Sequence, residues 1–223
     1  MGIIGVEKAN HLFWLGRYTE RVFTTLKVFF RYYDVMIEKE PTFYKDFCKR
    51  LSIPNVYFSK EQFVSDYLFD KDNPDSIYAN LLRAYHNAVV MRNDLSSECL
   101  SYIQMALDVF ENSKESKAPL VALQPVIDDI YAFWGSLDDY MTSDESRNMI
   151  KTGKYIERLD LYLRLSIGEY DLKKEWDKVK KQIGKIDWEY DRSSLEAFDR
   201  LCENQNYKVK DVGHAVHLLE SIF

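Results

Sequence analysis

The chain has 223 residues, of which 46% are hydrophobic, 15% aromatic and 30% charged, with only 8 glycines and 5 prolines. So few glycines and prolines argue against a loop-rich all-β sandwich or barrel, and the hydrophobic content excludes a disordered chain. The formal net charge of −6 disfavours nucleic-acid binding, because a surface that binds the phosphate backbone is usually basic.

The first half of the chain has helical periodicity. Pro41 ends a long first helix, because a proline pushes the residue before it out of the α region. Asn73 is predicted to cap a later helix, with Pro74 at its first position and Asp75 favoured by the helix dipole. The predicted helices cover residues 11–37, two short stretches within 41–68, then 74–93 and 97–112.

The second half follows a linker candidate at residues 112–117 and is also helical. Two Ser/Thr-x-x-Glu capping boxes, beginning at Thr142 and Ser193, each predict a helix start. Gly168 is predicted to end or kink the helix before it. One predicted helix begins near Pro125. Four more are predicted over residues 142–167, 170–183, 193–203 and 211–222.

Because no stretch shows convincing strand alternation, the predicted fold class is all-α, a bundle of about seven to nine helices. We expect a single domain over residues 1–223. An internal pseudo-twofold repeat would divide it into halves of about 1–112 and 118–223.

The repeat is visible when residues 14–34 are aligned without a gap on residues 151–171. The two segments share the pattern Gly-[Arg/Lys]-Tyr-x-Glu-Arg. Similarity of this extent indicates a duplicated helical unit. The identical pairs are Gly16/Gly153, Tyr18/Tyr155, Glu20/Glu157, Arg21/Arg158, Leu26/Leu163, Tyr33/Tyr170 and Asp34/Asp171.

Arg21 and Arg158 occupy the same position at the edge of an apolar helical arc. An arginine there must either reach outward to water or meet an anion, because an unpaired buried charge is costly. The matching anions in the repeat are Glu20 and Glu157. We therefore expect each arginine to bind the glutamate of the other copy, in Arg21–Glu157 and Arg158–Glu20 pairs. The glycine five residues before each arginine would let the backbones approach closely.

Two interpretations of this Glu/Arg cluster remain open. It is either a symmetric salt-bridge network that sets helix register, or the lining of a central pocket that holds a carboxylate, phosphate or ammonium group. In the second case Glu20 and Glu157 are the candidate acid/base residues. The candidate ligand-binding residues are then Arg17, Arg21, Lys154 and Arg158, with Arg92 and Glu98 as a second layer.

Three segments resemble the bacterial alpha-E family, an α-helical domain of unknown function. They are residues 10–21 (NHLFWLGRYTER), residues 69–98 with their FDKDNPDSI, Asn87-Ala88 and RNDLSSE parts, and residues 153–158 (GKYIER). The sequence departs from the family pattern at His86, Val89 and Leu100.

The resemblance implies which genes accompany this one, but it implies no specific reaction. Alpha-E genes tend to lie beside, or to be fused to, ATP-grasp ligases and transglutaminase-like peptidases. This implies an accessory or partner role in peptide ligation or protein modification, in which the site binds a charged group of a peptide, amino acid or nucleotide. The alternative is a non-catalytic helical scaffold. The oligomeric state, the cofactor and whether the chain is itself an enzyme are left open.

Other chemistries find little support. The three cysteines form no Cys-x-x-Cys pair, and no Glu-x-x-His, glycine-rich phosphate loop or Gly-x-Ser-x-Gly elbow occurs. His214 and His217 have a spacing that could bind a metal, but a surface role is favoured, so no metal is expected. No apolar run reaches the roughly 18 residues of a membrane helix, and no targeting pattern is present. We expect a cytoplasmic protein.

Overall fold

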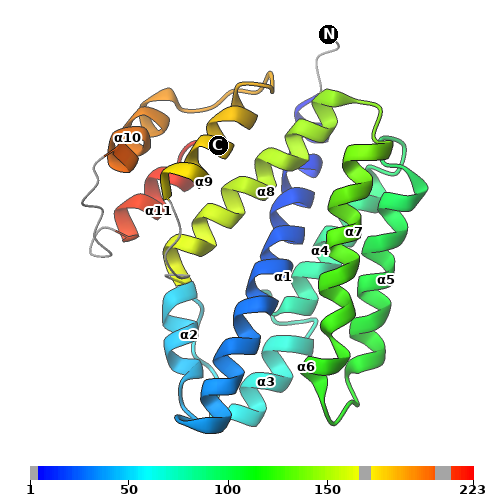
Figure 1. Cartoon of the computed structure of the whole chain (residues 1–223), viewed down its shortest axis with the longest axis vertical. Helices are drawn as coiled ribbons and strands as arrows, with labels where there is room; N and C mark the ends of the chain where they lie inside the picture. The colour runs from blue at the N-terminus through cyan, green and yellow to red at the C-terminus, as the bar shows by residue number, and fades with distance from the viewer. Residues whose placement is uncertain (1–4, 166–171, 204–211) are drawn as a thin grey trace.

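The computed structural model describes residues 5–165, 172–203 and 212–223, and their regular secondary structure is helical without strands (Figure 1). The all-α prediction is therefore confirmed. The expected seven to nine helices are close to this arrangement, which also contains the one-turn helix α6. The helices are α1 (Val6–Glu38), α2 (Tyr44–Leu51), α3 (Lys60–Phe69), α4 (Ile77–Val90), α5 (Ser97–Ser113), α6 (Pro119–Ala122), α7 (Gln124–Tyr140), α8 (Asp144–Leu165), α9 (Leu172–Ile183), α10 (Arg192–Glu203) and α11 (Val212–Glu220).

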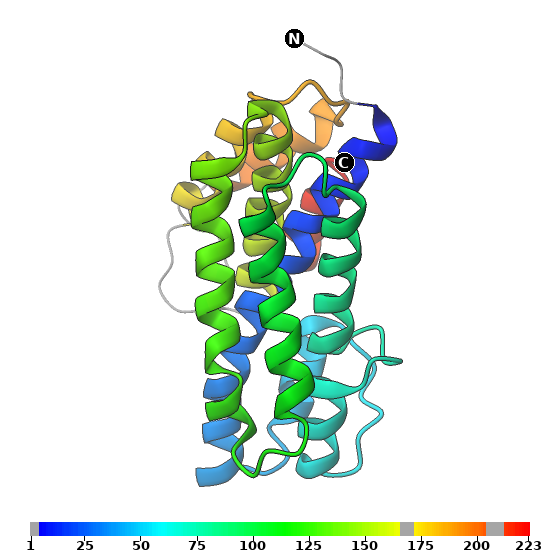
Figure 2. The ribbon, with the colours of Figure 1, turned by 90° about the vertical axis from the view of Figure 1, so that its right-hand side faces the viewer.

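Helix α1 lies at the centre of the molecule, and its buried residues surround its axis instead of forming one stripe. It packs most extensively against α8 on one side and α4 on the other. Figure 2 shows α4, α5 and α7 side by side as long neighbouring helices. Helices α5 and α7 pack against one another although they fall in different predicted halves of the repeat.

An aromatic core surrounds the C-terminal part of α1. The Phe29 ring lies 5.6 Å from the ring of Phe63, 5.8 Å from that of Tyr67 and 6.1 Å from that of Phe47, measured between centroids. These partners come from α2 and α3, the two short helices predicted in the aromatic stretch of the sequence. This packing brings the end of α2 and the Tyr67 side chain toward the middle of α1.

The C-terminal helices pack on the far side of α8, where Figure 1 shows α9, α10 and α11 as a group. Trp176 of α9 lies 4.6 Å from the ring of Phe198 and donates its indole N–H to Asp199. Phe223 returns to α1 and lies 5.2 Å from the Phe13 ring. The predicted kink at Gly168 and the predicted helix starts at 170 and 211 fall outside the described residues.

Three predicted helix caps are wrong by one to three residues, each for a local reason. Ser76 caps α4 by accepting from the Ala79 amide, because the Asn73 side chain instead accepts from the Asp75 amide in a turn. Ser143, one residue after Thr142, accepts from the Ser146 amide. At the start of α10 the cap is Asp191 in place of Ser193.

Asp191 takes the role predicted for Ser193 at the start of α10. Its carboxylate accepts from the Ser193 amide and from the Ser194 hydroxyl, so the helix begins at Arg192. A carboxylate is favoured at this position because it also meets the positive end of the helix dipole.

Candidate functional site

The two repeated segments meet where α1 crosses α8, and the two helices run in the same direction (Figure 1). Gly16 and Gly153 form the contact. A Cβ atom added to Gly16 would lie 2.0 Å from the carbonyl oxygen of Ile150, and one added to Gly153 would lie 2.0 Å from that of Phe13. Residues 13 and 16 correspond to 150 and 153 in the repeat, so the two contacts are equivalent. The predicted close approach at the glycines is confirmed.

Glu157 accepts from two arginines of α1. Arg17 Nε lies 2.7 Å from Glu157 Oε2, and Arg21 Nε lies 2.5 Å from Oε1. Glu157 is only 1% exposed. Burial alone would raise the pKa of its carboxyl group, but the positive charges of Arg21 and Arg17 lower this pKa below its ordinary value. Glu157 is therefore a buried carboxylate that stays ionised.

Glu20 occupies the equivalent position on α1 and is 0% exposed. Arg158 binds it through two nitrogens, with Nε 2.7 Å from Oε1 and Nη2 2.9 Å from Oε2. The hydroxyl of Thr24 donates to Oε1 at 3.0 Å. The predicted exchange of partners between the copies is thus confirmed. We call the five residues Arg17, Glu20, Arg21, Glu157 and Arg158 the Glu/Arg network.

The network departs from symmetry at Arg17 and Lys154, which correspond in the repeat. Arg17 reaches Glu157, whereas Lys154 makes no ion pair among the described residues and lies with Nζ 3.9 Å from the centre of the Trp134 ring. Burial lowers the pKa of Lys154 to about 8, and the charge of Arg158 acts in the same direction against that of Glu20. Of the two glutamates, Glu157 therefore has a second arginine partner and Glu20 does not.

Asp160 and Arg164 extend the network along α8. Arg164 Nε lies 2.9 Å from Asp160 Oδ1, while its other nitrogens donate to Ser52 after α2 and to Glu220 of α11. Burial and the charge of Glu157 raise the pKa of Asp160 to about 6, against the opposing effect of Arg164. Arg164 thus joins three elements that are remote in sequence.

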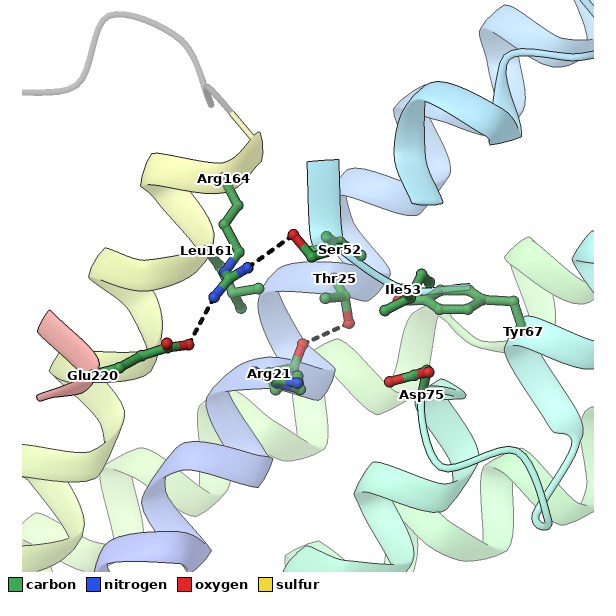
Figure 3. Close-up of a pocket in the computed structure, with 10 residues that line it drawn as sticks. Arg21, Thr25, Ser52, Ile53, Tyr67, Asp75, Leu161, Arg164 and Glu220 are labelled. Atoms are coloured by element: carbon green, nitrogen blue, oxygen red, sulfur yellow. Dashed lines mark hydrogen bonds and ion pairs between the residues drawn. The ribbon is translucent and has the colours of Figure 1, made fainter. Parts of the chain in front are cut away.

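A cavity of about 320 Å³ lies beside the network, between α1, α8, α11 and the segment that follows α2. We call it the Arg21 pocket. Its polar lining comes from Arg21, Thr25, Ser52, Tyr67, Asp75, Arg164 and Glu220, and its apolar lining from Leu51, Ile53 and Leu161. In the view of Figure 3, the Asp75 carboxylate and the Arg164–Glu220 pair lie on opposite sides, with Arg21 between them.

Arg21 belongs to both the network and the pocket. Its side chain is 37% exposed, and within the described residues its ion pair runs through Nε to Glu157, which leaves Nη1 and Nη2 without a protein acceptor. Burial raises the pKa of the neighbouring Tyr67 hydroxyl far above its ordinary value, although the charge of Arg21 opposes this. Tyr67 therefore offers a neutral hydroxyl beside the guanidinium group.

The comparisons with known proteins give one match. Residues 7–208 match the model of Alpha-E, described as a predicted alpha-helical domain with a conserved ER motif. The chain belongs to the Alpha-E family. Comparisons with curated proteins and with solved structures gave no match. Two Glu-Arg pairs, Glu20-Arg21 and Glu157-Arg158, lie within the matched residues, and both stand in the buried interface of this Alpha-E domain.

The other residues predicted for the site lie elsewhere. Arg92 and Glu98 are exposed around the turn between α4 and α5, and within the described chain neither pairs with the Glu/Arg network. They do not form the expected second layer, because α4 ends at Val90 and the chain turns there at the surface. Among the residues that depart from the family pattern, His86 is exposed, whereas Val89 and Leu100 are half-buried.

Four charged residues at the site of this Alpha-E domain were not predicted from the sequence: Asp75, Asp160, Arg164 and Glu220. For Asp160 and Arg164 a signal was present, since they stand four apart on one helix and Asp160 follows Glu157 by three. Ser52 and Glu220 offer no such signal, because only the packing of α2 and α11 on α8 brings them to Arg164.

His214 and His217 are exposed on α11 of this Alpha-E domain. Within residues 5–165, 172–203 and 212–223, no cluster of three or more His, Cys, Asp or Glu side chains has the arrangement of a metal site. In the same ranges, every helix is too short or too polar to cross a membrane.

Proposed function

We propose that this Alpha-E domain is an accessory protein of an ATP-grasp-linked peptide ligase or protein-modification system, and that its Arg21 pocket holds a charged group of the substrate. The observation that carries the binding role is the double position of Arg21. Its Nε is held by buried Glu157, while the residue, whose side chain is 37% exposed, also lines a cavity of about 320 Å³. The partnership rests on the family resemblance, which implies ATP-grasp ligases and transglutaminase-like peptidases as neighbours.

In this proposal the Glu/Arg network is the frame of the site. Glu20 and Glu157 are 0% and 1% exposed, so a substrate could reach either carboxylate only by displacing its arginines. The ionised Glu157 is also a poor proton donor. We therefore assign both glutamates a positioning role, and we assign direct binding to the part of Arg21 that lines the pocket.

The alternative is a non-catalytic scaffold in which the whole Glu/Arg network has only a structural role. The closed, fully paired state of Glu20 favours it, because Arg158 and Thr24 supply three hydrogen bonds to that carboxylate. Both proposals give the network the same structural role. They differ only over whether the Arg21 pocket binds a ligand.

Co-purification from the native host tests the partnership. A tagged chain, captured at native expression level, should enrich an ATP-grasp ligase or a transglutaminase-like peptidase identified by mass spectrometry. The untagged strain is the control. Stable partners that include neither class would contradict the partnership.

Two matched variants test the pocket once such a ligase is in hand. Arg17→Lys and Arg21→Lys each keep a positive charge near Glu157, but only Arg21 lines the pocket. A lysine Nζ cannot serve the network and the pocket together. We expect similar melting temperatures for the two variants, with about tenfold or greater loss of ligase stimulation for Arg21→Lys alone. Equal loss in both variants would favour the scaffold.

A further inference from the structure

The charges that line the Arg21 pocket are balanced, with two cations, Arg21 and Arg164, and two anions, Asp75 and Glu220. Arg164 and Glu220 satisfy one another at 2.7 Å. Arg164 further donates to Asp160 and Ser52, so its nitrogens are committed. The remaining pair, Arg21 and Asp75, therefore decides what the pocket can bind.

Arg21 and Asp75 face the same cavity without forming an ion pair with each other. No cationic side chain of the described residues pairs with the Asp75 carboxylate, and Nη1 and Nη2 of Arg21 have no acceptor there. A guanidinium group and a carboxylate that share a cavity but do not meet leave room for a molecule between them that carries both opposite charges.

The turn before α4 holds Asp75 in place. The Asn73 side-chain oxygen accepts from the Asp75 amide at 3.0 Å, and the Asn73 amide group donates to the Tyr57 hydroxyl at 3.0 Å. The Ser76 hydroxyl donates to the Asp70 carbonyl at 2.5 Å. These bonds tie the backbone on both sides of Asp75 to the fold, so its side chain is held at the pocket before any ligand arrives.

We propose that the Arg21 pocket binds a small zwitterion that carries an ammonium and a carboxylate group, such as a free amino acid or a very short peptide. The ligand carboxylate would meet Nη1 and Nη2 of Arg21, with the Tyr67 hydroxyl beside it, and its ammonium would meet Asp75. This inference rests on the proposed function and names the substrate class of that site.

Charge and size exclude the other ligand classes considered from the sequence. A phosphate or a nucleotide would bring its negative charges against Asp75 and Glu220, and a simple amine would face Arg21 and Arg164. The volume of about 320 Å³ is at the small end of the range for small-molecule sites, which suits an amino acid better than a nucleotide.

Ligand-observed NMR titration of the full chain tests this assignment. The zwitterionic probes are L-alanine, L-glutamate, L-lysine and L-alanyl-L-alanine. Propionate keeps only the carboxylate, ethylamine keeps only the ammonium, and AMP is the nucleotide. We expect at least one zwitterion to bind, and to bind about tenfold or more tightly than propionate, ethylamine or AMP.

A matched pair of variants locates the site. Asp75→Asn removes the charge of a carboxylate that makes no ion pair within the described chain, so the fold should be kept, which circular dichroism checks. It should weaken zwitterion binding by about tenfold or more. Asp72→Asn, the same change at an exposed position outside the pocket lining, should leave binding unchanged.

Three results would overturn the inference. They are AMP binding more tightly than every zwitterion, zwitterion binding that survives Asp75→Asn, and binding of none of the probes. A co-purified ligase together with any of these would leave the partnership standing and remove only the ligand class. Zwitterion binding without a co-purified ligase would support the ligand class and contradict the partnership.

Discussion

Glu157 shows how single residues determine the character of the interface. Its carboxylate lies out of water between two guanidinium groups, and their charges outweigh the effect of burial on its pKa. A buried pair of this kind adds little net stability over an apolar contact, but removal of one partner leaves an uncompensated charge. The residue is therefore far harder to replace than its net contribution suggests.

Replacement of Glu157 should be strongly destabilising. Glu157→Gln would leave Arg17 and Arg21 without their anion, and we expect a loss of about 3–5 kcal/mol in the free energy of unfolding. Urea unfolding followed by circular dichroism measures this. Glu115→Gln, at an exposed position, should change stability by less than about 0.5 kcal/mol. A loss at position 157 as small as that at 115 would contradict the prediction.

Lys154 should make stability depend on pH in the alkaline range. Its pKa in the folded chain is about 8, below the ordinary 10.5, so the unfolded chain binds more protons between these values. Stability therefore gains a contribution as pH rises from about 8 to about 10.5 and loses it as pH falls back through 8.

Paired urea titrations at pH 7, 8, 9 and 10 check this sign. Lys154→Met should remove the rise, whereas Lys117→Met, at an exposed position in the linker, should keep it. Parallel curves for the two variants would show that Lys154 does not have the lowered pKa.

At the scale of elements, the crossing of α1 and α8 depends on the absence of two side chains. Backbone carbonyls occupy the places where a Cβ atom on Gly16 or Gly153 would stand. Backbone cannot move aside as a flexible side chain can, so an added methyl group must separate the helices. Separation would also lengthen the ion pairs that bridge them, such as Arg158–Glu20.

Gly16→Ala and Gly153→Ala should each destabilise the chain by about 1–3 kcal/mol or more, the usual effect of overpacking a core. Gly135→Ala is the matched control, because nothing lies within 4 Å of its added Cβ and it sits inside α7. There the better helix propensity of alanine should raise stability by up to about 1 kcal/mol. Thermal unfolding distinguishes the cases, and equal effects at all three glycines would refute the close-contact explanation.

The exact caps of the helices were less predictable than the helices. Asn73, Thr142 and Ser193 are all suitable N-cap residues, yet Ser76, Ser143 and Asp191 are the residues that accept the helix amides. Neighbouring cap-forming residues compete, and the choice depends on the turn that tertiary packing imposes. Around Asn73 that turn also places Asp75 in the pocket. The prediction that Asp75 lies in the first turn of α4 therefore missed its place at the site.

At the scale of the whole molecule, stability should differ between the central helices and the C-terminal group. Helix α1 buries residues on all its sides, whereas α10 buries only Ser194 and Phe198. Segments with few buried apolar contacts open more easily than the core. Hydrogen exchange followed by mass spectrometry should therefore show faster amide exchange in α10 than in α1 or α8. Equal protection of α10 and α1 would contradict this expectation.

The sequence by itself determined the helical class, the positions of most helices and the exchange of Arg21–Glu157 and Arg158–Glu20 pairs. These features depend on local periodicity and on a repeat within the chain, both of which are visible in one dimension. Only the tertiary structure decided that the glutamates are enclosed, that Lys154 stacks on Trp134, and that Arg92 and Glu98 lie apart. It alone assembled the Arg21 pocket, because Arg21, Ser52, Asp75, Arg164 and Glu220 lie on segments far apart in the sequence, and packing brings them together.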